Sequence, residues 1–422
     1  MFALLPLIVF ILLYLIVSII VGDFYKVPIA VAFGVSSIIA VMTLRGKTIT
    51  ERLKIFSHGA ASENMMLMIW IFILAGAFAS SAKAMGSIDS TVNMTLAFLP
   101  SNMLMAGLFV AACFISLSVG TSVGTVVALV PIASAIAATT DTSTAMMTAV
   151  VVGGALFGDN LSFISDTTVV ATQTQGCKMS DKFHANIRIV APAAIVIFII
   201  YIIIGGQVQL PPKELNYSLS KVLPYLVVLI TAACGLNVMI VLTLGITLTG
   251  IIGIADGSYD VFGWMHSMND GILGMGELIV VTMLAGGMLE VVRHNGGINL
   301  IIRGITHHIS STRGGELAIA FLVIAVDFCT ANNTVAIITV GPIAKQIAER
   351  FNIAPRRTAS LLDTFSCFAQ GIIPYGAQLL MAAGLAAITP VEIIPYLYYP
   401  YALGIAAIIA ILISTSNDSK KE

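Results

Sequence analysis

Long apolar runs recur along almost the whole of this 422-residue chain, separated by short polar stretches. A helix needs about 20 apolar residues to cross the hydrocarbon core of a bilayer. Because hydrocarbon offers no hydrogen-bond partner, the backbone of such a run must pair with itself as a helix. Charged residues make up only 10% of the chain, whereas a soluble domain carries about 25%. The sequence therefore predicts an all-α polytopic integral membrane protein with the lipid bilayer as its main partner.

About seven membrane segments are expected in each half of the chain, because that many apolar runs approach a spanning length. The first run lacks a basic leader and a cleavage site, so we expect it to be retained as a spanning helix. The expected segments lie at roughly residues 3–21, 27–44, 60–82, 102–119, 121–138, 144–177, 187–205, 222–238, 239–255, 267–290, 316–330, 331–347, 358–389 and 400–415.

The positive charges predict how these segments are oriented. Most Lys and Arg residues fall in five clusters, at residues 45–54, 178–188, 293–313, 345–357 and 420–421. Cytoplasmic loops are enriched in Lys and Arg, so we expect all five clusters and both termini on the cytoplasmic side of a cell (inner) membrane. The net charge of −1 offers no basic surface for nucleic acid.

The two halves of the sequence repeat each other at an offset of 211 residues. The run Pro131-Ile132-Ala133 falls on Pro342-Ile343-Ala344. The basic loop 45–54 falls on residues 256–265, which contain no Lys or Arg. Loops that change from basic to non-basic change sides of the membrane, which predicts two inverted-topology repeats, residues 1–208 and 209–422. Folds of this kind carry discontinuous helices or re-entrant hairpins at mid-membrane, and we expect them here.

Polar interruptions of the apolar runs are the candidate sites, because transporters bind their substrates where helices are broken near mid-membrane. The stretch 116–125, rich in glycine and hydroxyl groups, falls at the 211-residue offset on the stretch that begins at Asp327. Alternatively, the hydroxyl groups and glycines only allow helices to pack closely. The candidate ion- or substrate-binding residues of this pair are Thr121, Ser122, Asp327, Asn332, Asn333 and Thr334.

A second pair of interruptions lies at residues 158–168 and 363–374. A carboxylate at membrane depth costs about 3 kcal/mol, so it needs a proton, a partner or an ion. Hard cations such as Na⁺ prefer carboxylate, hydroxyl and carbonyl oxygens. One site could hold either H⁺ or Na⁺, with Asp159 and Asp166 as the Na⁺ ligands. The candidate residues of this pair are Asp159, Asn160, Ser162, Ser165, Asp166, Thr167, Thr168, Asp363, Ser366 and Pro374.

The stretch Gly153–Thr168 closely resembles the signature of the NhaC-type sodium/proton antiporter family, a G-A-Y-F-G-D-K-x-S-P-x-S-D-T-T run. That family exchanges external protons for internal Na⁺, and its relatives couple Na⁺ or H⁺ to organic acids or amino acids. Asn160 stands where a Lys is usual, Phe163 replaces a Pro, and Tyr375 replaces the Trp that follows Pro374. Without that Lys, we expect the site to lose a positive charge. The resemblance implies functional roles for Asp159, Ser162, Ser165, Asp166, Thr167, Asp363 and Pro374.

The preferred hypothesis is a secondary active transporter that exchanges cytoplasmic Na⁺ for external protons by alternating access. We expect no enzymatic activity and no cofactor beyond the transported ions. A Na⁺- or H⁺-coupled transporter of a small carboxylate or amino acid is the first alternative, with helix N-termini holding the carboxylate. An intramembrane aspartyl protease is the second, but Leu156 stands where the first Gly of a GxGD motif belongs. A homodimer is compatible with each hypothesis.

Overall fold

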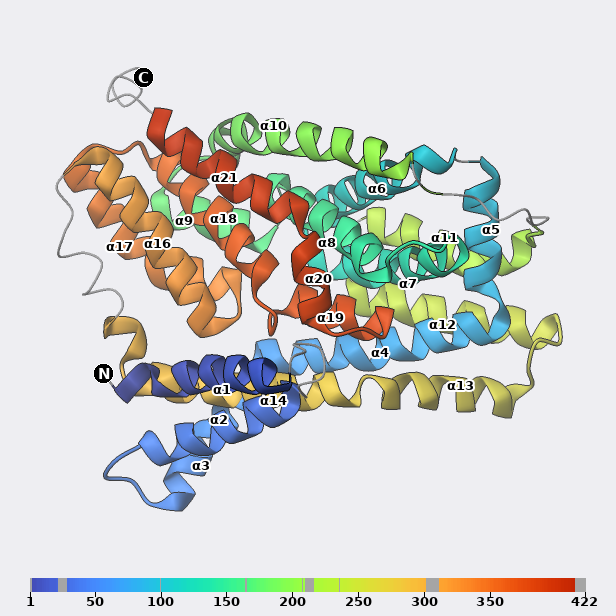
Figure 1. Cartoon of the computed structure of the whole chain (residues 1–422), viewed down its shortest axis with the longest axis horizontal. Coiled ribbons are helices and arrows are strands. Elements are labelled where there is room, and N and C mark those ends of the chain that lie inside the picture. The colour runs from blue at the N-terminus through green and yellow to red at the C-terminus, as the bar shows by residue number, and fades with distance from the viewer. Residues whose placement is uncertain are drawn as a thin grey trace.

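The computed structural model describes residues 2–21, 29–98, 100–163, 165–206, 208, 216–234, 236–300 and 311–413. Within these ranges the long regular elements are all α-helices, and no strand is present. Figure 1 shows them as a bundle elongated along one axis. The helices are α1 (Leu5–Val21), α2 (Ile29–Thr43), α3 (Ile49–Ala60), α4 (Glu63–Met85), α5 (Ser87–Phe98), α6 (Leu104–Val119), α7 (Ser122–Thr139), α8 (Thr144–Leu161), α9 (Asp166–Gln175), α10 (Met179–Gly205), α11 (Leu219–Ala233), α12 (Val238–Ala255), α13 (Val261–Gly274), α14 (Gly276–His294), α16 (Thr312–Thr330), α17 (Asn333–Phe351), α18 (Pro355–Ile372), α19 (Ala377–Ala386), α20 (Pro390–Ile393) and α21 (Tyr398–Ile413).

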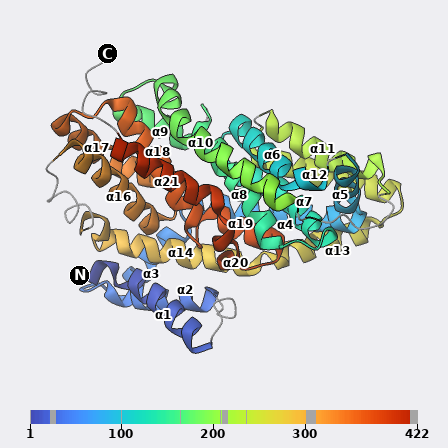
Figure 2. The ribbon, with the colours of Figure 1, turned by 45° about the horizontal axis from the view of Figure 1, so that its top comes forward.

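Two long helix pairs, α3–α4 and α13–α14, run past each other and form one side of the bundle. α4 packs against α12 and α13, and α14 packs against α2 and α3. Glycine allows backbones to approach closely at these crossings. A Cβ atom on Gly76 would lie 2.4 Å from the carbonyl oxygen of Gly271, and one on Gly59 would lie 2.4 Å from that of Gly286. In Figure 2, α1, α2 and α3 lie on the opposite side of α14 from α18 and α21.

The other side of the bundle holds the interrupted helices. α6 and α7 pack on α8, α16 and α17 pack on α18, and α10 packs against both α18 and α21. The short helices cross between the halves: α9 packs against α17 and α18, while α19 packs against α7 and α8. The candidate residues therefore lie in the interior of this part of the bundle.

Four breaks interrupt these helices. Gly120 is the C-cap of α6 and Ala331 is the C-cap of α16, and both have the left-handed backbone (φ 72° and 49°) that turns the chain into the next helix. α8 and α9 are separated by residues 162–165, and α18 and α19 by residues 373–376. A further bend of 100° separates residues 355–386 from Pro390–Tyr396. The discontinuous helices expected from the sequence are thus present.

The expected membrane segments agree with the described helices in most places. Among the described residues, six helical stretches are long and apolar enough to span a membrane, or up to seven if the bent pair counts as one span. Four shorter apolar helices accompany them in the same part of the chain. The amphipathic helix α3 and the polar helix α5 escaped prediction because they are short and interrupt the apolar pattern. α13 and α14 form one nearly continuous apolar stretch, so the sequence predicted a single segment at 267–290 that covers part of both. Part of the cluster at 293–313 and all of residues 420–421 lie outside the described residues.

Candidate functional site

Asp159 lies in the last turn of α8 and is the carboxylate of a small hydroxyl-rich cluster. Its side chain is only 5% exposed. The Ser122 hydroxyl donates to its Oδ2 atom at 2.8 Å, and the Ser165 hydroxyl donates to its Oδ1 atom. Ser122 is the first residue of α7 and Ser165 is the N-cap of α9. Two helix breaks thus converge on one buried carboxylate.

Two glutamines link this cluster to the second half of the chain. Gln378, in the first turn of α19, donates from Nε2 to the Ser122 hydroxyl at 2.9 Å. Gln370, in α18, donates from Nε2 to Gln378 Oε1 at 2.9 Å and to the carbonyl of Ala331 at 3.3 Å. The chain of hydrogen bonds therefore runs from the α16–α17 break to the α8–α9 break through the interior of the protein.

A buried ion pair joins Lys182 of α10 to Asp363 of α18. Lys182 Nζ lies 2.5 Å from Asp363 Oδ2, and the two side chains are 1% and 0% exposed. The same ammonium group donates to the carbonyl of Asn160 at 2.5 Å and to the hydroxyl of Thr168 at 2.7 Å. Asn186, one turn further along α10, donates to Asp363 Oδ2 at 3.0 Å and to Asn160 Oδ1 at 2.9 Å. Four helices contribute to this second polar cluster.

The placement of Lys182 corrects two expectations. The sequence grouped it with Lys178 and Arg188 as a cytoplasmic loop charge, and it placed the start of the helix near residue 187. α10 begins at Met179 instead, with Lys178 and Arg188 exposed and Lys182 on the buried face. Asn160 itself carries no charge, but Lys182 brings an ammonium group to its backbone carbonyl, so the site contains a cation that was not predicted there.

Asp327 lies apart from these clusters. It is fully buried in the last turns of α16, and neither carboxylate oxygen has a hydrogen-bond partner among the described residues. Asn332 caps α17 by accepting from the backbone of Val335 at 2.9 Å. Asn333 is buried and accepts from the backbone of Thr334, a half-buried residue, at 3.0 Å. Within the described part of the chain, no hydrogen bond or ion pair joins Asp327 to Asp159.

The remaining candidates fall into structural and exposed positions. Asp166 is the first residue of α9 and its side chain is exposed, unlike that of Asp159. The hydroxyl groups of Ser162 and Thr167 lie at the α8–α9 break: Ser162 donates to the carbonyl of Leu117 at 2.9 Å, and the Thr167 hydroxyl lies 2.9 Å from that of Ser165. Thr121 is the N-cap of α7, and Pro374 lies in the α18–α19 break. Ser366 donates to the carbonyl of Asp363 at 3.0 Å.

Sequence reasoning missed Lys182, Asn186, Gln370 and Gln378. A signal existed for the first two, since Lys182 and Asn186 are four residues apart and continue into the buried stripe Ile189, Val190 and Ala193 of α10. Gln370 and Gln378 flank the α18–α19 break, but their link to Ser122 joins positions 256 residues apart. Local sequence pattern carries no information on such a contact.

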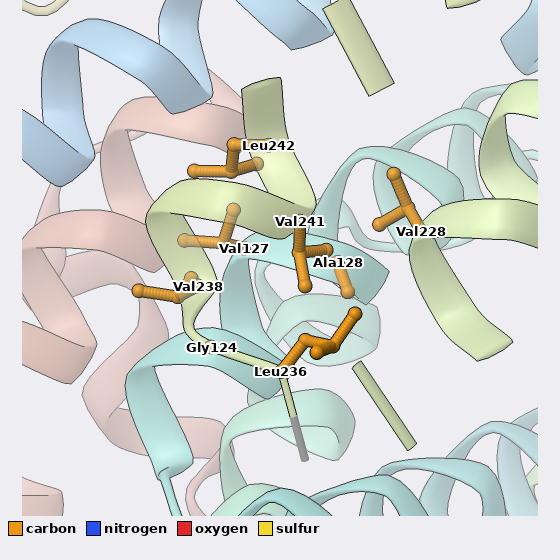
Figure 3. A pocket seen from close by; sticks show the side chains of 8 residues that line it. All are labelled: Gly124, Val127, Ala128, Val228, Leu236, Val238, Val241 and Leu242. Atoms are coloured by element: carbon orange, nitrogen blue, oxygen red, sulfur yellow. The ribbon is translucent and has the colours of Figure 1, made fainter. Parts of the chain in front are cut away.

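The bundle also contains a recess between α7, α11 and α12. Figure 3 shows its lining side chains, and all are apolar or glycine. An ion needs oxygen ligands that this lining does not supply, so the recess is no part of the ion site. Its lining residues are Gly124, Val127, Ala128, Val228, Leu236, Val238, Val241 and Leu242.

The fold and these clusters define the class of protein. Ionisable side chains buried inside a bundle of membrane helices are costly, and they mark substrate and ion pathways. Broken helices that meet at such groups are typical of secondary transporters. The chain is a polytopic helical membrane protein of the transporter class.

Comparison with known proteins gives the family. The model of the Na⁺/H⁺ antiporter family matches residues 1–206 and 215–417, so the chain belongs to that family. It is similar to the Na⁺/H⁺ antiporter NhaC of Alkalihalophilus pseudofirmus, with 25% identity over 303 residues, which are 64% of each chain. The NhaC of Bacillus subtilis is 24% identical over 386 residues, or 83% of each chain. The malate-2H⁺/Na⁺-lactate antiporter of Bacillus subtilis is 23% identical over 426 residues, covering 91% of this chain and 89% of the relative.

Proposed function

We propose that this protein is a secondary active transporter that exchanges cytoplasmic Na⁺ for external H⁺, with Asp159 as the carboxylate that the two ions share. The observation that carries the proposal is the burial of Asp159 between the hydroxyl groups of Ser122 and Ser165 at two helix breaks. Membership of the Na⁺/H⁺ antiporter family and the two NhaC relatives support it.

The chemistry of the cluster fits both ions. An ionised carboxylate and two hydroxyl oxygens are ligands that a hard cation prefers. A hydroxyl group can also turn its hydrogen toward the carboxylate, so the same two serines satisfy Asp159 when no cation is bound. A proton on Asp159 removes its negative charge and with it the main attraction for Na⁺. Because occupancy by one ion excludes the other, alternating access to this carboxylate is sufficient for antiport.

We also infer that residues 1–208 and 209–422 are two structural repeats. Helix bounds support this: α8 and α18 cover residues 144–161 and 355–372, and α9 and α19 cover residues 166–175 and 377–386, each 211 residues apart. Left-handed backbone positions recur at the same offset, in the pairs Gly46 and Gly257, Gly120 and Ala331, Asp141 and Asn352, and Gly176 and Ala387.

The proposed relation between the repeats is an inversion across the membrane. Packing between the halves is reciprocal. α4 contacts α12 and α13, and its counterpart α14 contacts α2 and α3, which are the counterparts of α12 and α13. In Figure 1 the α2–α3 connection lies at one end of the long axis and the α12–α13 connection at the other. The start of α1 and the end of α21 lie at the same end of the long axis as the basic α2–α3 connection, which supports cytoplasmic termini in a cell (inner) membrane. A homodimer remains a prediction, to be checked by cross-linking in the membrane.

A second candidate function is the exchange of a small organic acid coupled to Na⁺ or H⁺. The malate-2H⁺/Na⁺-lactate relative favours it, because it matches over 91% of this chain. Buried amide groups of Gln370 and Gln378 next to Ser122 are donors suited to a carboxylate substrate. Uptake of radiolabelled monocarboxylates, dicarboxylates and amino acids into proteoliposomes separates the two functions, because a Na⁺/H⁺ antiporter accumulates none of them.

The test of the proposed function is a pH gradient in everted membrane vesicles. Na⁺ addition is expected to dissipate the gradient in vesicles with the wild-type protein and to leave it intact with Asp159→Asn. Asp166 is exposed at the start of α9, so Asp166→Asn is expected to raise the Na⁺ concentration needed for exchange. Full exchange by Asp159→Asn at normal expression would overturn the assignment. Unchanged exchange by Asp166→Asn would remove Asp166 from the ion path.

A further inference from the structure

The ammonium group of Lys182 occupies an oxygen cage built by three other helices. Its ligands are a carboxylate oxygen of Asp363 from α18, the backbone carbonyl of Asn160 from α8 and the hydroxyl of Thr168 from α9, at 2.5, 2.5 and 2.7 Å. The Asn160 carbonyl is free to accept because α8 ends at the next residue. Carboxylate, carbonyl and hydroxyl oxygens are also the ligands of hard metal cations. The cage therefore has the chemistry of a metal-cation site.

A further oxygen of the same cluster lacks a partner. Asn186 donates from Nδ2 to Asp363, but its buried Oδ1 atom has no hydrogen-bond partner among the described residues. Buried polar atoms are almost always paired, so an unpaired acceptor beside a carboxylate calls for a donor or a cation. A structural ion pair alone gives no reason for this extra acceptor.

We propose that this cage is a second Na⁺ site, in which Lys182 acts as a tethered cation that Na⁺ replaces. The inference rests on the proposed function and adds a second carboxylate, Asp363, to the ion path. Na⁺ and the Lys182 ammonium group exclude each other in this site, because both need the same oxygen atoms of Asp363, Asn160 and Thr168. Lys182 lies one turn from the exposed Lys178, in the first turn of α10.

The experiment measures Na⁺ binding to the cage by thermal unfolding of the purified full-length protein in detergent. All variants carry Asp159→Asn, which removes the first carboxylate. Unfolding midpoints are compared in NaCl and in N-methylglucamine chloride at equal ionic strength. Lys182→Met is expected to gain a Na⁺-dependent rise on the order of 5 °C, because Na⁺ stabilises the folded state by binding to it. Lys178→Met, an exposed lysine of the same stretch, is the matched control and gains nothing.

Two further variants make every outcome decisive. Lys182→Gln keeps a neutral donor to Asp363 and is expected to show the same gain, whereas Lys182→Met combined with Asp363→Asn loses it. The proposal is overturned if neither lysine variant responds to Na⁺, if the response survives the loss of Asp363, or if neither variant folds even in Na⁺. Because Asp159 is absent throughout, this test and the vesicle test of the proposed function can fail independently.

Discussion

Replacing Gly158 by Ala tests whether the close packing of α6 on α8 positions Asp159. Gly158 precedes Asp159 on α8 and faces the α6 backbone. A Cβ atom at this position would lie 2.4 Å from the backbone nitrogen of Leu117 and 2.5 Å from the carbonyl oxygen of Cys113. These are backbone atoms, so no side-chain rotation relieves the clash. Ordinary contact begins at 3.4 Å, and the two helices would have to separate by roughly 1 Å.

The cost of that separation follows from the contacts that it strains. Overpacking a tight interface costs about 1–3 kcal/mol. Separation also stretches the bond from Ser116 to the carbonyl of Ala155 (2.5 Å) and that from Ser162 to the carbonyl of Leu117 (2.9 Å), each worth about 0.5–1.5 kcal/mol. The total loss expected for Gly158→Ala is therefore about 2–6 kcal/mol. Displacement of the last turn of α8 also moves Asp159 away from Ser122.

The assay pairs thermal unfolding in detergent with Na⁺/H⁺ exchange in vesicles. Gly158→Ala is expected to lower the unfolding midpoint and to reduce exchange by at least tenfold at matched expression, since a displacement of this size at a site costs on the order of 100-fold. Gly34→Ala on α2 is the control, because a Cβ there meets nothing within 4 Å. If Gly158→Ala is as stable and as active as the Gly34→Ala protein, the tight α6–α8 contact is not what holds the site.

Two predictions concern charge pairs away from the ion clusters. Arg357 donates two hydrogen bonds to the buried Glu316, at 3.1 and 3.0 Å. The Arg357→Met substitution is therefore expected to lower the free energy of unfolding by about 3–5 kcal/mol. An unchanged midpoint of thermal unfolding would show that Glu316 is hydrated. In the α12–α13 connection, hydrogen bonds from Ser258 and then the charge of Lys221 hold the pKa of Asp256 below its usual range. That stabilisation is present above the unfolded-state pKa of about 3.9 and is lost as pH falls through the lower folded-state value. The Asp256→Asn substitution is therefore expected to lower the unfolding midpoint at pH 7 and to lower it progressively less as the pH falls below about 3.9; a shift of equal size at pH 7 and in acid would contradict this.

The sequence predicted the spanning helices and their breaks because both follow from local composition. Apolar runs must be helical in hydrocarbon, and the glycines and hydroxyls of residues 116–125 interrupt such a run at the observed end of α6. The cap at Gly120 follows the same logic, since glycine readily adopts the left-handed conformation. The equivalent cap is Ala331, where no glycine marks the break and the polar residues Asn332 and Asn333, together with the offset of 211 residues, indicated it.

The contacts within the site were beyond local pattern. Hydropathy and charge counts treat every lysine as a loop residue, which concealed the burial of Lys182. The bond from Gln378 to Ser122 depends on how α19 crosses α7, a tertiary contact. Asp159 and Asp166 carried equal weight in the sequence. The helix break decides between them, because it buries Asp159 against two serines and leaves Asp166 exposed on the first turn of α9.

The central claim is that Na⁺ and H⁺ compete for Asp159, and the pH dependence of Na⁺ transport tests it most directly. Initial rates of Na⁺ uptake into proteoliposomes with the purified protein give KM and the maximal rate at each pH. Competition predicts that the KM for Na⁺ rises steadily as the pH falls while the maximal rate stays constant. A KM that does not change with pH, with only the maximal rate falling in acid, would show that the two ions do not share a site.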